Sequence, residues 1–122
     1  MNVALWVVAG LLAAAFLAAG FMKLAQPRPK LVAAGMGYAE DFSDGAIKGI
    51  GTLEVLGALG LILPAVLDTA TVLVPLAALG LFLVMAGAVV VHIRRHEPFV
   101  PPLVLGLLAL FVAVLRFGTY SL

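Results

Sequence analysis

The stretch at residues 49–64, GIGTLEVLGALGLILP, decides how this chain folds. Apart from Thr52 and Glu54 it is apolar or small, and it forms the centre of segment 46–66, which is long enough to cross a membrane as a helix. A charged side chain near mid-bilayer costs at least about 2.5–3.5 kcal/mol. Glu54 is therefore predicted to face the interior of a helix bundle, either protonated or paired with a cation.

The whole chain shares this apolar character. Of its 122 residues, 65% are hydrophobic and 11% are charged, whereas soluble domains average about 45–50% and about 25%. These values indicate an integral membrane protein whose main partner is the lipid bilayer, and the net charge of +1 gives no support for a nucleic-acid partner. The absence of cysteine excludes disulfides and thiol chemistry by the chain itself. A redox role would require a bound cofactor, a metal on other ligands or a partner subunit.

Four segments have the length and composition of membrane-spanning helices. They are residues 3–25, 46–66, 71–93 and 99–117, and the one long loop is 26–45. The later loops are short, so neighbouring helices are expected to be antiparallel. We therefore expect an all-α membrane protein in which residues 1–122 form a single domain, a four-transmembrane-helix antiparallel bundle.

The long loop carries both apolar and charged residues. Leu31, Val32, Met36, Tyr38 and Phe42 are interspersed with charge, which is typical either of a segment lying on the membrane or folded over the bundle, or of an ordinary solvated loop. At its end, an aspartate at position 44 is expected to cap the second long helix.

Basic residues near the helix ends predict the orientation. Most of them flank one face of the membrane, namely Lys23, Arg28, Lys30, Lys48, Arg94 and Arg95. Only Arg116 belongs to the opposite face. The positive-inside rule therefore predicts that loops 26–45 and 94–98 are cytoplasmic and that both termini are outside.

Small residues occur in every predicted helix and favour close helix packing. The glycines concerned are Gly10, Gly20, Gly57, Gly60, Gly80 and Gly87.

Three ionisable residues from three helices are predicted at similar depth in the cytoplasmic half. Lys23 ends the first helix, Glu54 lies about two turns inside the second, and His92 is in the last turn of the third. We interpret Lys23, Glu54 and His92 as candidate ligand-binding residues, with Glu54 and His92 as candidate catalytic residues. Alternatives remain open: Lys23 extending to lipid headgroups, a Glu54–Lys23 pair that only sets helix register, and an interfacial His92.

A metal site is considered and not predicted. His92 and His96 would share a helix face at i, i+4, and Glu54 could complete a two-histidine, one-carboxylate set. Arg94, Arg95 and Pro98, however, indicate that the helix ends near His96. The run from Arg94 to Glu97 is interpreted as a solvated loop that sets orientation.

Several motifs, in order along the chain, resemble the DoxX-like family of small four-helix bacterial membrane proteins. They are GFMKL, IGTLEVLGALGLILP, MAGAVVVHIRRHEP and PPLVLGLLALFVAVLR. The resemblance covers nearly the whole chain and weakens across residues 26–44. It implies the four-helix fold and an association with membrane oxidoreductase or quinone biology, because the family is named after a subunit of a thiosulfate:quinone oxidoreductase. Lys23, Glu54 and His92 fall at the motif positions.

Three functions are compatible with these observations. The first is a small subunit that binds a quinone or other hydrophobic small molecule, with any redox cofactor supplied by a partner oxidoreductase subunit. The second is a membrane scaffold or assembly protein, and the third is a stand-alone acid–base enzyme, an isomerase or hydrolase, on a lipid-soluble substrate. A transporter would require a homo-oligomer. Whether the chain is an enzyme is not decided by sequence.

Overall fold

Helices make up the regular structure of the described part of the chain. The computed structural model describes residues 2–33 and 42–118, and its elements are α1 (Asn2–Ala25), α2 (Arg28–Ala33), α3 (Asp44–Leu67), α4 (Leu73–Arg94) and α5 (Val100–Phe117). All except α2 are long and apolar enough to cross a membrane. The predicted fold class, an all-α membrane protein with a four-helix bundle, is confirmed.

The four long helices begin and end within two residues of the predicted positions. The predicted cap of α3 is wrong. The N-cap is Ser43, which has extended backbone angles and whose Oγ accepts a hydrogen bond from the Ala46 N–H at 3.1 Å, while Asp44 is already helical. Serine and aspartate are about equally good caps, so the sequence pattern alone does not choose between them.

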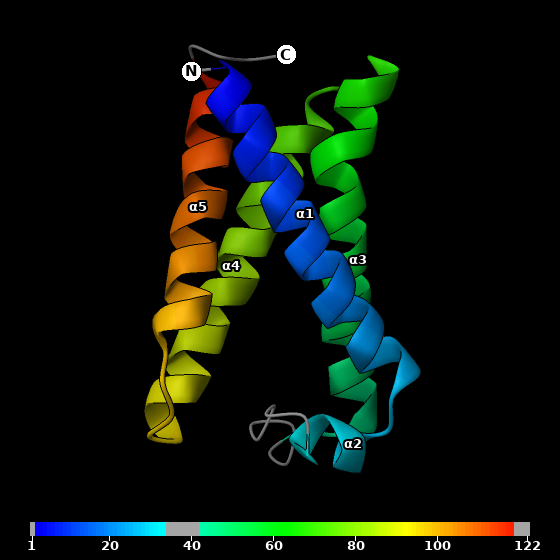
Figure 1. The fold of residues 1–122 in the computed structure, drawn as a ribbon, viewed down its shortest axis with the longest axis vertical. Coiled ribbons are helices and arrows are strands. Elements are labelled where there is room, and N and C mark those ends of the chain that lie inside the picture. The colour runs from blue at the N-terminus through cyan, green and yellow to red at the C-terminus, as the bar shows by residue number, and fades with distance from the viewer. Residues whose placement is uncertain (1, 34–41, 119–122) are drawn as a thin grey trace.

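The helices associate in two pairs. α1 packs most extensively on α3, and α4 on α5, while α3 joins the two pairs through its contact with α4. The start of α1 and the end of α5 lie at one end of the molecule (Figure 1). The two pairs diverge toward the other end, where α2 lies (Figure 1).

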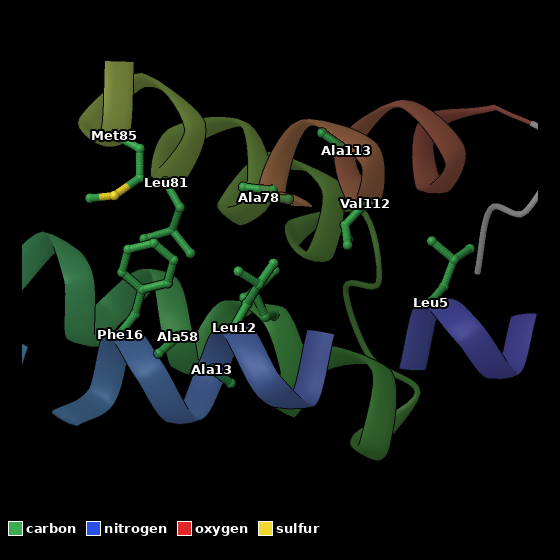
Figure 2. Close-up of a cluster of buried hydrophobic side chains, with 12 residues drawn as sticks. Leu5, Leu12, Ala13, Phe16, Ala58, Ala78, Leu81, Met85, Val112 and Ala113 are labelled. Carbon is green, nitrogen blue, oxygen red and sulfur yellow. The ribbon is translucent and has the colours of Figure 1, made fainter. Parts of the chain in front are cut away.

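The core lies where the two pairs meet. Leu12 and Phe16 on α1 point toward α4, where Ala78, Leu81 and Met85 face them (Figure 2). The buried cluster consists of Leu5, Leu12, Ala13, Phe16, Ala58, Leu61, Ala78, Leu81, Met85, Ala109, Val112 and Ala113. Large apolar side chains also cover the outside of the bundle, Leu11 and Val66 being 66% and 63% exposed. Such a surface suits lipid.

Part of the long loop folds back onto the bundle. Leu31 of α2 is buried against Ile47 of α3, and Met22, Val32 and Phe42 pack around them. The side chains Met36 and Tyr38, which contributed to this expectation, lie outside the described residues.

Candidate functional site

The site begins with a close approach between α1 and α3. A Cβ atom built on Gly20 would lie 2.7 Å from the Gly51 carbonyl oxygen, and one built on Gly51 would lie 2.9 Å from the Gly20 carbonyl oxygen. Real Cβ atoms essentially never approach backbone so closely. Only glycine on both helices allows this backbone contact, which brings the side chains one turn away within reach of each other.

Lys23 and Glu54 form an ion pair next to this contact. The Lys23 Nζ donates a hydrogen bond to Glu54 Oε1 at 2.5 Å. Both residues are buried, Lys23 being 5% and Glu54 1% exposed. The predicted inward orientation of Glu54 and its pairing with a cation are therefore seen in the structure.

Lys23 extends into the bundle and not toward the headgroups. A Cβ built on Gly51 would be 2.9 Å from the Cβ of Lys23, so the two residues lie at the same level of the antiparallel pair. Glu54 is three residues farther along α3, about 4.5 Å deeper at the usual helical rise. The side chain of Lys23 spans this distance. The structure therefore favours an inward-facing Lys23 over the alternative in which it extends to lipid headgroups.

Lys48 fixes the end of α1 from the opposite helix. Its ammonium donates to the carbonyl oxygens of Lys23 and Leu24 at 3.1 and 2.7 Å, and to that of Gln26 at 3.5 Å. These carbonyls lack helical partners, and a cation at a helix C-terminus is favourable. Lys48 thereby holds the backbone that carries Lys23, a role beyond the contribution to orientation that its charge predicts from sequence.

A cavity of about 540 Å³ opens between the two helix pairs, and the ion pair forms part of its wall. It is lined by Phe16, Lys23, Phe42, Ile50, Glu54, Leu83, Val84, Met85, Gly87, Ala88, Val91, His92, Pro98, Pro101, Pro102 and Leu105. Phe16 and Met85 also belong to the core cluster, so the cavity begins where the packed core ends. All three predicted site residues therefore line one space.

His92 lines the cavity from α4. Its Nδ1 lies 3.4 Å from Glu97 Oε1, and the other oxygen of Glu97, Oε2, lies 3.2 Å from Arg95 Nε. Sequence reasoning missed Glu97 because it treated the run after His92 as a solvated loop, whereas the side chains of Glu97 and Arg95 are only 26% and 23% exposed.

His96 does not share a helix face with His92. α4 ends at Arg94, and His96 has a left-handed backbone with φ 57°. Within residues 2–33 and 42–118, no three His, Asp, Glu or Cys side chains are placed to hold a metal ion.

Some predicted small-residue contacts are wrong. Gly57 faces Leu81 and Gly60 faces Ala77, as close packing requires, but around Gly10, Gly80 and Gly87 a built Cβ would meet no atom within 4 Å. The sequence pattern predicts that these segments are helices, but it does not predict which way each glycine faces. The exposed glycines therefore could not be distinguished from the packed ones.

A second buried charge lies at the other end of the bundle. Arg116 on α5 is 5% exposed, and its guanidinium carbon lies 6.0 Å from the centre of the Trp6 ring on α1. This is a cation–π contact. From the sequence, Arg116 contributes only to the predicted orientation, because nothing in the pattern pairs it with Trp6.

The cavity residues combine apolar walls with a few polar groups. Pockets for small ligands typically measure about 300–1,000 Å³ and are mostly apolar with a few polar groups that fix orientation. Here the polar groups are a carboxylate, an ammonium and an imidazole. Together they can donate, accept and transfer protons at one end of an apolar ligand.

Comparison with known protein families supports the resemblance to the DoxX-like family. The sequence model of the DoxX-like family matches residues 7–114. No curated protein and no solved structure gave a match. The chain belongs to the DoxX-like family.

Proposed function

We propose that this chain is a small membrane subunit that binds a quinone or another hydrophobic small molecule beside the Lys23–Glu54 pair. The observation that carries the proposal is the cavity of about 540 Å³, whose apolar walls meet Lys23, Glu54 and His92. A purely structural ion pair needs no adjoining space. This one borders a volume within the range of ligand pockets.

In this role the chain handles protons. Quinone reduction takes up two electrons and two protons, and a redox cofactor in a partner oxidoreductase subunit supplies the electrons. Glu54 and His92 exchange protons with the ligand oxygens, and Lys23 balances the charge of Glu54 at its 2.5 Å contact.

We further propose the membrane orientation and setting. Lys23, Arg94 and Arg95 lie at the α2 end of the bundle, and the positive-inside rule puts that end in the cytoplasm. The cavity then occupies the cytoplasmic half of a bacterial plasma membrane, with residues 1–122 acting as one domain.

The direct test is mass spectrometry of small molecules that co-purify with the protein in mild detergent. We expect a stoichiometric quinone or similar molecule with the wild type. Its amount should fall in Glu54→Gln, which keeps the shape of the side chain but removes its charge. An empty wild type together with an equally stable, equally empty variant would contradict the proposal and favour the scaffold role.

A further inference from the structure

We infer that Glu97 is a positioning residue that fixes the proton of neutral His92 on Nδ1, so that the site selects ligands bearing a hydroxyl group. This inference rests on the proposed function and specifies its ligand class. The chemical preference is for a phenol or quinol headgroup over a quinone carbonyl.

The turn after α4 brings Glu97 back to His92. His96 adopts φ 57°, and its N–H donates to the Ile93 carbonyl oxygen at 3.1 Å, while the Glu97 N–H donates to the His92 carbonyl oxygen at 2.9 Å. These are the two hydrogen bonds of a Schellman motif. They fold the chain over the last helical turn, so residues five apart in sequence face each other.

The side chains complete this contact. Glu97 Oε1 lies 3.4 Å from His92 Nδ1, an electrostatic contact without hydrogen-bond geometry, and both facing atoms are buried. Arg95 Nε holds the second oxygen, Oε2, at 3.2 Å. A carboxylate oxygen repels a nitrogen lone pair and attracts an N–H, so the geometry favours the tautomer of His92 with its proton on Nδ1.

The consequence for the cavity concerns Nε2. With the proton on Nδ1, Nε2 of neutral His92 presents a lone pair and accepts hydrogen bonds. Among the described residues, the other charged groups of the cavity wall are Lys23 and Glu54, which form an ion pair, and α5 contributes proline and leucine side chains there. The Lys23 ammonium can donate to either kind of oxygen and is already engaged by Glu54. The carboxylate and the Nε2 lone pair are acceptors, so they bind a hydroxyl and not a carbonyl, and they account for the preference.

Nitrogen NMR tests the tautomer directly. The chain has two histidines, so a protein labelled with ¹⁵N-histidine gives two ring spin systems, which His96→Gln assigns. At about pH 8, where an ordinary imidazole is neutral, we expect His92 to carry its proton on Nδ1. Glu97→Met should shift the population toward Nε2–H. Arg94→Met removes a neighbouring positive charge at an exposed position and leaves both Glu97 and Arg95 in place, so it should preserve the wild-type spectrum.

Binding provides the second measurement. Titration with a decyl-substituted benzoquinone and its quinol should show about tenfold tighter binding of the quinol, a difference of about one hydrogen bond. The preference should disappear in Glu97→Met and persist in Arg94→Met. A wild-type His92 protonated on Nε2, or a tautomer unchanged by Glu97→Met, would overturn the inference, and the wild-type spectrum decides even where the variant does not fold. If neither form binds, the quinone version of the proposed function fails, while the spectrum still decides the role of Glu97.

Discussion

The two ends of the bundle bury charge in different surroundings. At the end that holds the start of α1, the Arg116 guanidinium lies over the Trp6 ring, and apolar side chains such as Leu5 and Val112 fill the interior. At the α2 end, Lys23 and Glu54 pair at the wall of a cavity. The same four helices therefore provide a packed end and an open end, and the buried charge of the open end adjoins space that a ligand can occupy.

The largest expected loss of stability follows from removing one partner of the Lys23–Glu54 ion pair at the open end. Glu54→Leu leaves the Lys23 ammonium buried without its carboxylate, which typically costs about 3–5 kcal/mol. The double variant Glu54→Leu with Lys23→Met should recover most of that stability, because it removes both charges. Equilibrium unfolding in mixed micelles measures both. If Glu54→Leu alone were as stable as the wild type, the ion pair would not contribute to the stability of the fold.

The next effect concerns the helix contact that holds the pair. Gly20→Ala places a Cβ 2.7 Å from the Gly51 carbonyl oxygen, so α1 and α3 must separate. Overpacking of this kind costs about 1–3 kcal/mol. Gly10→Ala is the matched control on the same helix, because its Cβ meets nothing within 4 Å and should not destabilise the protein. Equal unfolding free energies for the two variants would contradict the backbone contact.

The cavity itself can be filled without disturbing the packing. Gly87 lines it and has open space around it, so Gly87→Leu should leave stability nearly unchanged while the affinity for the decyl benzoquinone probe falls about tenfold, or 1.4 kcal/mol. Gly80→Leu, two turns earlier on α4, also faces open space but does not line the cavity. Its affinity should equal that of wild type. If both variants bind equally well, the ligand lies elsewhere.

The smallest effect belongs to the packed end. Arg116→Met removes the contact with Trp6 and should cost about 0.5–1 kcal/mol in unfolding free energy. Probe affinity should not change, because Arg116 does not line the cavity. A clear loss of binding in this variant would mean that the packed end influences the cavity, which would contradict the separation of the two ends.

Sequence reasoning predicted one half of the candidate site better than the other. Glu54 stood out because a carboxylate inside an apolar helix requires an internal partner, and Lys23 was the cation at a suitable depth. Glu97 did not stand out, because its contact with His92 depends on the left-handed conformation of His96. That conformation is uncommon for residues other than glycine.

The sequence by itself determined the membrane location, the four helices and their approximate ends, because length, hydropathy and breaker residues are local properties. It also identified Glu54 as a residue that faces the bundle interior, since a charged group at that depth in a helix is costly wherever it faces lipid. Only the tertiary structure decided which glycines pack, that Lys23 extends inward, and that the helix pairs diverge around a cavity. These features depend on helix rotation and crossing, which arise from the packing of whole helix faces and which a nearly uniform apolar sequence does not encode residue by residue.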